Sequence, residues 1–477
     1  MMTFKASCAG PALLFAAFSG HALAGTLTVN VAGDPAGPGT CPTLCSLRQA
    51  IDTAVNGDTV LFAPSLPTPI NLTGGALAIN KFLLIQGPGA AKLTVSGQNA
   101  TQVLHVGGQA IISGLTFADG MFAGSVGGNG TDNTGAAGDP GGGAGGACVR
   151  ISAGGTLVLD HVAVHHCVAR GGHGGKGGSG IPGSIDPMNP IFAGPGGTGG
   201  VGGEARGAAI LVYGSLSLLN SSVVDGEAYG GDGGAGGSGG FDFSVTAFGG
   251  NGGAGGLADG GAVYAASGTT LRIANATLAE SVATGGGGGS PGLLFFPGTP
   301  GNGGNADGGL VRIAGSAALA DIEFSTLANG HVTGGLGGTG GIIGGMDGTM
   351  LGNAISTVAN TNVLSSVIVG AQAGAEVCDG NVTAAGGSSN LSEDTSCAGF
   401  TLHQTFAQVF HPLNVNTTPW PGYVPLYKGA PIDAAQTCND LATQVVASDQ
   451  HDTYRPQGAK CDLGAIEADY IFVDGFE

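Results

Sequence analysis

Four polar side chains recur at one position of a repeating pattern, each shortly before a glycine-rich run. They are His166, Asp225, Glu280 and Asn329. If the repeats stack as strands, Asp225 and Glu280 lie about 5 Å apart, one strand spacing. A carboxyl pair at about 5 Å is the arrangement of a retaining glycosidase, and a wider pair is that of an inverting one. The same column also fits a solvated polar ladder beside a loop, and we favour that interpretation over catalysis.

A polysaccharide lyase would instead need an acidic calcium site and an arginine or lysine base. The arginines near the repeats are scattered and form no cluster in the sequence; they are Arg150, Arg170, Arg206, Arg272 and Arg312. Catalysis therefore stays the alternative, with Asp225, Glu280 and His166 as its candidate residues.

Metal-binding patterns in the sequence are weak. His165 and His166 are adjacent, and neighbouring residues on a strand face opposite sides, so we expect them not to share an ion. Segment 127–132 (GGNGTD) matches the start of a calcium-binding glycine-rich nonapeptide, but such sites need tandem copies. Segment 171–176 (GGHGGK) lacks the spacing and the following helix of a phosphate loop. We expect no metal site and no cofactor, with calcium left open.

A second polar column precedes the first by five residues and consists of His161, Asn220 and Asn275. Asparagine tolerates tight corners, so this column predicts a ladder that stabilises turns.

The repeat that carries both columns holds about two dozen residues of short strands with alternating apolar side chains. Equivalent residues in the first two copies are Leu157, Leu159, Val162 and Val164 against Leu216, Leu218, Ser221 and Val223. A unit this small cannot bury its apolar face alone, so the copies must stack. The sequence therefore predicts an all-β parallel β-helix. A β-sandwich with long loops would not explain equivalent residues after each insertion.

The insertions are glycine runs, and the chain has 99 glycines among 477 residues. They cover residues 124–146, 171–203, 230–256, 285–305 and 334–348. Their G-G-x period of three matches an extended left-handed helix without internal hydrogen bonds, whereas collagen needs Gly-x-y and more than 22 prolines. Two alternatives stay open: an ordered bundle of extended glycine helices on one face, or disordered bristles, which the entropy of ordering glycine favours.

The ends of the chain read differently from the repeats. Residues 12–20 form an apolar stretch too short to span a bilayer, and Ala22–Ala24 fits a signal cleavage site, so we expect the mature chain to start at Gly25. Segment 46–57 (SLRQAIDTAVNG) predicts a helix that ends at Gly57 and covers the open end of the solenoid. The expected units are a signal peptide at 1–24, an N-terminal cap at 25–69, the β-helix at 70–400, a C-terminal cap at 401–470 and a tail at 471–477.

Charge and cysteine content limit the partners and the compartment. The net charge of −19 predicts repulsion from nucleic acid, and no later segment is apolar for long enough to span a membrane. Eight cysteines remain after signal cleavage, and an even number in a secreted chain indicates disulfides. They fall in local pairs: Cys41 and Cys45, Cys148 and Cys167, Cys378 and Cys397, Cys438 and Cys461. Zinc is the rival interpretation for the first pair, but no second pair stands at metal spacing.

Segment 45–51 (CSLRQAI) resembles the CSLREA-type motif that opens many secreted bacterial β-helix proteins. Its matching residues are Cys45, Ser46, Leu47, Arg48 and Ile51, with Gln49 where glutamate is usual. Segment 453–467 (TYRPQGAKCDLGAIE) is similar to the choice-of-anchor-type closing segment of that family. The repeats GGAV and GGLV, at 260–263 and 308–311, are distantly similar to those of polymorphic outer-membrane protein passengers.

The resemblance implies a right-handed parallel β-helix in an exported protein, at the cell surface or outside a Gram-negative bacterium. The last residues, 471–477 (IFVDGFE), resemble a short tail on secreted proteins of some Gram-negative bacteria. We expect a non-catalytic protein of adhesion or of cell-surface or extracellular structure, with a glycan or a protein as its ligand. The alternative is a glycoside hydrolase or lyase, and an ice- or mineral-binding face is a third option.

Overall fold

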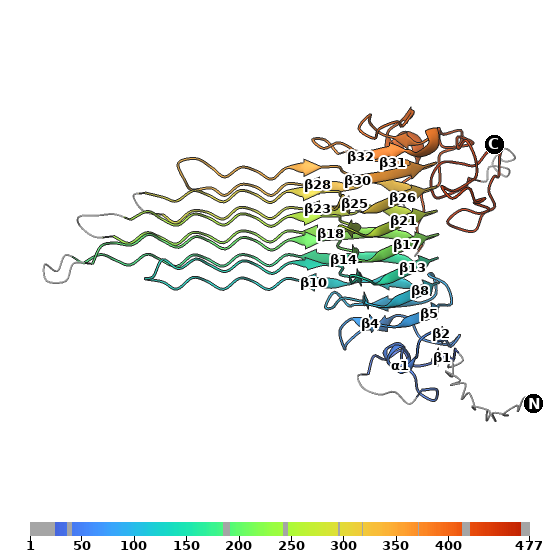
Figure 1. Cartoon of the computed structure of the whole chain (residues 1–477), viewed down its shortest axis with the longest axis horizontal. Coiled ribbons are helices and arrows are strands. Elements are labelled where there is room, and N and C mark those ends of the chain that lie inside the picture. The colour runs from blue at the N-terminus through green and yellow to red at the C-terminus, as the bar shows by residue number, and fades with distance from the viewer. Residues whose placement is uncertain are drawn as a thin grey trace, which may run out of the picture.

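The chain folds into a right-handed parallel β-helix from which paired extended arms project to one side (Figure 1). The computed structural model describes residues 24–35, 41–184, 191–241, 247–293, 296–316, 318–370, 372–412 and 420–468. The tail at 471–477 and all of the expected signal peptide except Ala24 lie outside the described residues. None of the helices in the described part of the chain has the length and hydrophobicity needed to span a bilayer.

A 16-stranded parallel sheet forms two faces of the solenoid. The first face contains β1 (Thr26–Val29), β2 (Thr59–Phe62), β5 (Phe82–Gln86), β8 (Gln109–Ser113), β13 (Thr156–Asp160), β17 (Ser215–Leu219), β21 (Thr270–Ala274), β26 (Leu319–Glu323), β30 (Ile355–Leu364) and β32 (Cys378–Ala384). The second face contains β4 (Leu77–Ile79), β7 (Leu104–Val106), β12 (Val149–Ile151), β16 (Ile210–Val212), β20 (Val263–Ala265) and β25 (Val311–Ile313). The long strand β30 pairs with strands of both faces and joins them into one sheet.

A 13-stranded sheet forms the third face and continues into the roots of the arms. The third face holds β3 (Ile70–Asn71), β6 (Thr94–Ser96), β9 (Thr116–Ala118), β14 (Ala163–Arg170), β18 (Ser222–Tyr229), β22 (Thr277–Ala279), β27 (Thr326–Ala328), β31 (Val367–Val369), β33 (Leu391–Ser392) and β34 (Leu402–His403). The outgoing roots are β10 (Met121–Ala123), β23 (Val282–Thr284), β28 (His331–Thr333) and the ends of β14 and β18. The returning roots form a 5-stranded sheet of β11 (Ala144–Gly145), β15 (Ala205–Arg206), β19 (Ala258–Asp259), β24 (Ala306–Asp307) and β29 (Met350–Leu351).

The core of the solenoid consists of ladders of like apolar residues, as the repeat predicts. Leu157 pairs with Leu216, and Leu159 with Leu218, on neighbouring coils. These four side chains are buried. Because burial of a leucine side chain is worth about 1.5–3 kcal/mol, the stacked ladders supply the driving force that a single coil lacks.

The CSLRQAI motif forms a short helix at the start of the solenoid. Helix α1 spans Leu47–Thr53, and Ser46 and Gln49 form a capping box, a role that glutamine fills as well as the more usual glutamate. The prediction that the helix runs to Gly57 is wrong: it ends at Ala54, where the Lys81 ammonium donates to the Ala54 carbonyl at 2.7 Å.

Arg48 of the same motif has a structural partner. Its guanidinium binds the buried Asp34 carboxylate at 2.7 Å and also donates to the carbonyls of Gly75 and Ala76. Burial alone would raise the pKa of Asp34, but the Arg48 hydrogen bond and those from Gly74 and Thr73 hold it below its ordinary value. The motif thus ties the segment before the helix to the first coil.

Four disulfides form between the predicted partners: Cys41–Cys45, Cys148–Cys167, Cys378–Cys397 and Cys438–Cys461. Cys148 and Cys167 are both fully buried and join the chain before β12 to β14, close to where the arms leave the coils.

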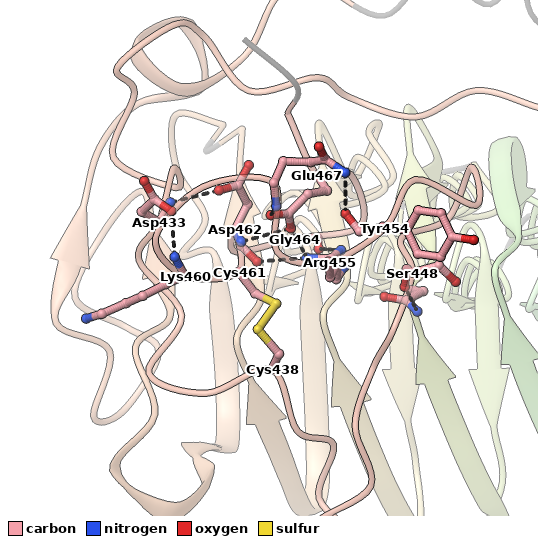
Figure 2. Close-up of a disulfide and its surroundings, with 12 residues drawn as sticks. Asp433, Cys438, Ser448, Tyr454, Arg455, Lys460, Cys461, Asp462, Gly464 and Glu467 are labelled. Carbon is pink, nitrogen blue, oxygen red and sulfur yellow. Dashed lines mark hydrogen bonds and ion pairs between the residues drawn. A yellow bond between two sulfur atoms is a disulfide. The ribbon is translucent and has the colours of Figure 1, made fainter. Parts of the chain in front are cut away.

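The C-terminal segment, residues 401–412 and 420–468, lies along the side of several coils and does more than cover the last one. Asn275 Nδ2 donates to the Ser448 carbonyl at 3.0 Å, and the Ala465 amide donates to Thr326 Oγ1 at 3.0 Å. Figure 2 shows how the Cys438–Cys461 disulfide and the neighbouring polar residues hold this segment together. The C-terminal segment also contains the helix α2 (Phe406–Val409). The short helix η1 (Ala385–Gly387) precedes this segment in the chain.

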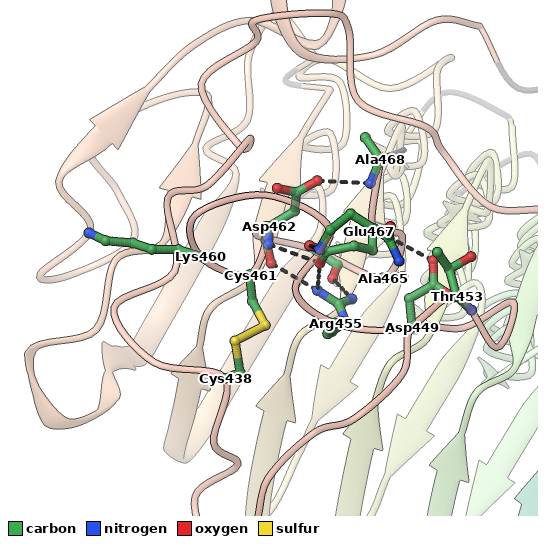
Figure 3. Close-up of polar contacts among 12 residues, drawn as sticks. Cys438, Asp449, Thr453, Arg455, Lys460, Cys461, Asp462, Ala465, Glu467 and Ala468 are labelled. Carbon is green, nitrogen blue, oxygen red and sulfur yellow. Dashed lines mark hydrogen bonds and ion pairs between the residues drawn. A yellow bond between two sulfur atoms is a disulfide. The ribbon is translucent and has the colours of Figure 1, made fainter. Parts of the chain in front are cut away.

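A fully buried ion pair lies at the centre of this segment. Arg455 Nη1 is 3.0 Å from Glu467 Oε2, and both side chains are inaccessible to solvent. Arg455 also donates to the carbonyls of Asp462 and Gly464, while Glu467 accepts from the Asp462 amide (Figure 3). The pair therefore connects turns that have no regular secondary structure.

Five glycine-rich hairpins leave the coils and form two layers of arms. The outgoing layer consists of residues 124–132, 171–183, 230–241, 285–293 and 334–340, and the returning layer of 135–143, 191–204, 247–257, 296–305 and 344–349. The amides of Gly171 and Gly174 donate to the carbonyls of Tyr229, at the root of the next outgoing arm, and Asp232, within that arm, at 2.8 Å each. The intervening Gly172 donates to Gly142 in the returning layer. This three-residue period confirms the ordered bundle and excludes disordered bristles for the described arms.

Close packing of the arms explains the G-G-x pattern. A Cβ added to Gly200 would lie 1.9 Å from the Asp139 carbonyl oxygen, and one on Gly202 would lie 1.8 Å from that of Gly231. Gly143 occupies the third position of the period, and a Cβ there would meet its nearest atom at 3.6 Å. In the inner arms, two of every three positions therefore have little room for a side chain and are mostly glycine, and the third points outward and is free to vary.

We predict that Gly200→Ala separates the arms around it, because the methyl group and the Asp139 oxygen cannot share the same space. Amide hydrogen exchange across 171–203 should become at least tenfold faster, since the loss of a few hydrogen bonds of about 1 kcal/mol each opens the bundle locally. Gly143→Ala is the matched control and should leave exchange unchanged. Equal protection in both variants would refute close packing as the reason for glycine.

We predict that Arg455→Met destabilises the C-terminal segment by about 3–5 kcal/mol, because it leaves the Glu467 carboxylate buried without its partner. Trp420, the single tryptophan, lies in this segment, so its fluorescence during urea denaturation reports the change. Lys460→Met removes an exposed cation from the same loop and should change stability by less than about 0.5 kcal/mol. A variant of Arg455 that unfolds at the wild-type urea concentration would contradict the role given to the pair.

Candidate functional site

The columns of polar residues predicted from the sequence occupy corners of the coils. The column with the catalytic candidates has φ between 51° and 53° at Asp119, His166, Asp225, Glu280 and Asn329. The second column has φ of 56°, 46° and 50° at His161, Asn220 and Asn275, which confirms the predicted turn ladder. Left-handed backbone favours Asn, Asp and Gly, so the corner geometry explains much of the polar composition without chemistry. A third corner uses glycine alone, at Gly146, Gly207, Gly260, Gly308 and Gly352.

The strand register places Asp225 and Glu280 beside each other on neighbouring coils. Val224 pairs with Ala279 and Glu227 with Val282, so the two carboxyl-bearing corners are one rung apart, as predicted. His166 lies on the preceding coil, with Nε2 3.5 Å from Asp225 Oδ2 and Nδ1 3.7 Å from Asp119 Oδ1. The structure therefore brings the three candidate residues into one ladder.

The Glu280 carboxylate is already engaged by neighbouring side chains. Its Oε1 accepts hydrogen bonds from Tyr423 Oη at 2.6 Å and from Asn329 Nδ2 at 2.7 Å. Tyr423 belongs to the C-terminal segment and is buried, which raises its pKa and keeps the hydroxyl as a donor. The later members of the ladder, Glu280 and Asn329, thus attach the C-terminal segment.

Asp225 is the member of the ladder whose carboxyl group has a raised pKa. Burial raises its pKa, the His166 imidazole acts in the opposite direction, and the carboxylates of Glu280 and Glu227 raise it further. A carboxyl group with a raised pKa beside a second carboxyl group is the arrangement of a general acid with a nucleophile or base. This is the one feature of the ladder that a hydrolase would use.

The expectation that His165 and His166 face opposite sides is wrong. Their Nδ1 atoms lie 3.0 Å apart and the rings meet edge to face, with centroids 4.7 Å apart. The reason is the left-handed φ of 53° at His166, which interrupts the alternation of the strand. Burial, with the positive field of His166, lowers the pKa of His165 to about 4. Among the described residues no group of three or more His, Cys, Asp or Glu side chains is arranged to hold a metal ion.

Asn129 and Asp132, in the segment similar to a calcium-binding repeat, have another role. Asn129 Oδ1 accepts from the Lys176 amide and Asp132 Oδ1 from the Ser179 amide, both at 2.9 Å. These amides belong to third positions of the next arm, which face away from the bundle. Asn251 and Asn302 do the same for the amides of the adjacent returning arms. The signal in the sequence is an Asn or Asp at every-third positions of the glycine runs, at Asn129, Asp132, Asn251 and Asn302.

The five arginines near the repeats are all engaged. Arg150, Arg170 and Arg206 stack on tyrosine rings at 5.7, 4.3 and 5.3 Å from the ring centroids. Arg206 also pairs with Glu204 at 2.7 Å, and Arg312 with Asp307 at 3.4 Å. None of these contacts resembles a free base beside an acidic calcium site.

Arg272 lines a small cleft between the solenoid and the C-terminal segment. The cleft has a volume of about 190 Å³, and Glu323 and Asp440 are also among its lining residues. Arg272 is 2.9 Å from Glu323 and 3.1 Å from Asp440, so one guanidinium is shared by two carboxylates. This arrangement attaches the C-terminal segment and leaves no unpaired acid or base among these three.

The two faces of the bundle differ in the number of charged side chains at their third positions. The outgoing face presents Asp132, Lys176 and Asp232 with the imidazole of His173. On the returning face, third-position residues are Asn, Thr, Ala and apolar side chains, with Glu204 near the root as the acid. A shallow groove of about 470 Å³ on that face is lined in part by Asn251, Thr299, Asn302 and Ile343.

No family model matches the chain, and no curated protein matches it either. Among solved structures, a polyproline type II helical bundle antifreeze protein from the springtail Granisotoma rainieri is similar over 40% of this chain and 94% of its own, at 24% identity and a TM-score of 0.16. Pectate lyase Pel9A is similar over 94% of this chain and 97% of its own, at 13% identity and a TM-score of 0.30. The PL6 family alginate lyase AlyGC covers 84% of this chain and 55% of its own, at 14% identity and a TM-score of 0.17. Similarities this low carry no argument about activity.

We predict that His161→Asn lowers stability by about 1–2 kcal/mol at pH 6, since solvent screens this partly exposed ion pair, and by progressively less towards pH 9. The hydrogen bond to Asp160, opposed by burial and aided by Asp452, raises the pKa of His161 to about 9. Because the pKa of His161 is higher in the folded than in the unfolded protein, the protonated ring stabilises the fold fully below the unfolded pKa near 6.5. This stabilisation is lost as the pH rises through about 9. Asparagine keeps the left-handed corner. Urea denaturation between pH 5.5 and 9.5 measures the difference.

His173→Asn is the control for this titration, because asparagine can still accept the Asp232 amide in the bundle. It should change stability by less than about 0.5 kcal/mol at every pH. A constant difference between His161→Asn and the wild type across the pH range would show that the imidazolium does not stabilise the corner.

Proposed function

We propose that the protein is an exported, non-catalytic β-helix protein that acts in adhesion or in cell-surface or extracellular structure. The observation that supports this function is the ordered glycine bundle. Its arms are bonded to neighbours on both sides and across the two layers, so the bundle is a stiff plate that presents side chains at every third residue. A stiff, exposed plate suits contact with a surface, whereas catalysis needs a concave site that excludes water.

The occupied polar ladder also supports a non-catalytic role. Glu280 is held by Tyr423 and Asn329, and the arginines near the repeats stack on rings or pair with acids. Four disulfides favour an oxidising compartment, which agrees with the export expected from the N-terminal sequence.

The alternative is a polysaccharide-degrading enzyme that uses the same ladder. The specific observation in its favour is Asp225, whose pKa is raised and which lies one rung from Glu280. In that case Asp225 would donate the proton and Glu280 would have to exchange its Tyr423 bond for the substrate.

The first experiment measures polymer length and protein binding together. Residues 25–477 are incubated with pectin, alginate, glucan and host glycans, with and without calcium, and analysed by size-exclusion chromatography. We expect the polymers to keep their length with the wild type, Asp225→Asn and Glu280→Gln alike. Shortening of a polymer that disappears in Asp225→Asn would establish the enzyme instead.

The second part of this experiment measures attachment of the labelled protein to fixed cells. We expect Gly200→Ala, which opens the bundle, to lower attachment by at least tenfold, and Gly143→Ala to bind like the wild type. Attachment that survives in Gly200→Ala, with exchange data showing an opened bundle, would argue against the bundle as the binding element.

A further inference from the structure

A small pocket lies where the roots of the first two returning arms meet the second face of the solenoid. It has a volume of about 240 Å³, and its lining includes Phe122, Arg150, Glu204, Arg206, Leu211 and Tyr213. Arg150 and Leu211 belong to the paired strands β12 and β16, and Arg206 belongs to the returning root β15. The ladder of Asp225 and Glu280 lies beside strands of the third face, so this pocket is a separate feature of the molecule.

Arg150 is the cation of this pocket that has no acidic partner. Its guanidinium stacks on the Tyr213 ring, 5.7 Å from the centroid, and forms no ion pair with any carboxylate that the structure describes. The residues beside it on the neighbouring coils are His105 and Leu211, neither of which is an acid. The pocket therefore contains a guanidinium for which the described part of the chain provides no counterion.

The repeat shows where a counterion for Arg150 belongs. The strand pairs of the second face place Arg312 at the position of Arg150, three coils further along the solenoid. Arg312 pairs with Asp307 at 3.4 Å. The pairs of the returning roots trace the position of Asp307 back to Gly145 on the coil of Arg150. At the coil of Arg150 a glycine thus stands where the later coil has the acid.

The chain has no room to supply this acid itself. A Cβ on Gly145 would lie 2.2 Å from the Arg206 carbonyl oxygen. Glu204, the acid of the pocket, is engaged by Arg206 at 2.7 Å, and Arg206 also contacts Asp259 at 3.4 Å. Two guanidinium groups and one carboxylate make the pocket lining positive in a chain whose net charge is −19. A local positive field of this kind selects an anion.

The other groups of the pocket favour an acidic sugar over a simple anion. A guanidinium holds a carboxylate by two parallel hydrogen bonds. Glu204 can still accept hydrogen bonds from hydroxyl groups, because a carboxylate has about four acceptor positions. The Tyr213 ring is 36% exposed and, with Phe122, offers apolar surface to the C–H face of a sugar ring. Acetate or phosphate would use Arg150 alone, whereas a uronate, which is a sugar with a carboxylate, would use all four residues.

The size of the pocket limits the ligand to one ring. Its volume of about 240 Å³ is below the roughly 300–1,000 Å³ of pockets for drug-sized molecules. A single sugar residue therefore enters, and the rest of a glycan stays outside.

We infer that this pocket binds one uronate residue of an acidic glycan, with the uronate carboxylate on Arg150. The inference deepens the proposed adhesive function by naming the class of ligand, and it rests on that function. The ligand carboxylate takes the role that Asp307 has beside Arg312. The sugar ring lies against Tyr213, and its hydroxyl groups donate to Glu204.

The test is titration of residues 25–477 with sodium galacturonate and sodium glucuronate, followed by saturation-transfer difference NMR. Galactose and glucose are the matched neutral sugars, since each has the same ring without the carboxylate. We expect saturable binding of the acids and at least tenfold weaker binding of the neutral sugars. Added salt should weaken binding of the acids, because Arg150 is only half-buried.

Substitution of Arg150 assigns the binding to this pocket. Arg150→Gln should lower the affinity for the uronates at least tenfold and leave that for the neutral sugars unchanged, because it removes the charge but keeps a polar side chain. Arg170→Gln is the matched control and should bind like the wild type. Arg170 also stacks on a tyrosine, Tyr229, at 4.3 Å, but it lies on an outgoing root outside the pocket. Amide exchange across 171–203 should equal that of the wild type in both variants, which shows that the arms are intact.

Uronates that bind no more tightly than the neutral sugars overturn the inference, and so do equal losses in Arg150→Gln and Arg170→Gln. Acetate, inorganic phosphate and triglycine are titrated in parallel. Tighter binding of acetate or phosphate than of the uronates would make this an anion site without sugar recognition. Tighter binding of triglycine would make a peptide carboxyl terminus the ligand, and either result refutes the acidic sugar.

The outcomes also separate this inference from the proposed function. If no uronate binds while the labelled protein still attaches to fixed cells, the inference falls and the adhesive function stands. If uronates bind through Arg150 while the polymers of the first experiment are shortened, the sugar site stands and the non-catalytic function falls.

Discussion

The spacing between hydrogen-bonded neighbours controls the whole molecule. Parallel strands on successive coils lie about 4.8 Å apart. Each coil sends one hairpin outward, so the arms start with this spacing already set by strands such as β14 and β18. The arms then continue the same bonding, for example from Gly171 to Tyr229, with no room left for a Cβ on the shared surfaces. The solenoid thereby aligns the arms. Isolated glycine chains would not align, because ordering them costs too much conformational entropy.

Stacking also determines which polar residues occupy the corners of the coils. A turn that requires positive φ selects Asn, Asp or Gly, and stacking repeats that choice at each rung. The resulting column of Asp225, Glu280 and Asn329 looks like a catalytic array in the sequence. In the structure, two of these residues are used to hold Tyr423 and the C-terminal segment. A ladder of acids in a β-helix is therefore weak evidence for catalysis until its partners are known.

Stiffness and reach are what the glycine bundle adds to the β-helix. Two bonded layers hold the arms beside one another away from the coils, while Asn and Asp side chains satisfy amides at the third positions. The disulfide between Cys148 and Cys167 and the buried Arg455–Glu467 pair secure the solenoid and its cover. The stabilising chemistry thus lies at the origin of the arms.

The sequence by itself determined the parallel β-helix, the disulfide partners and the corner at which the arms leave, because these follow from local periodicity and spacing. It also placed Asp225 next to Glu280, since the register follows from matching Leu157 with Leu216. Only the tertiary structure decided that the glycine runs are ordered, because their order comes from bonds between arms distant in the chain. The same holds for the contact between His165 and His166, which depends on one left-handed corner, and for Tyr423 on Glu280, which joins residues 143 positions apart. Long-range contacts of this kind have no local pattern from which to predict them.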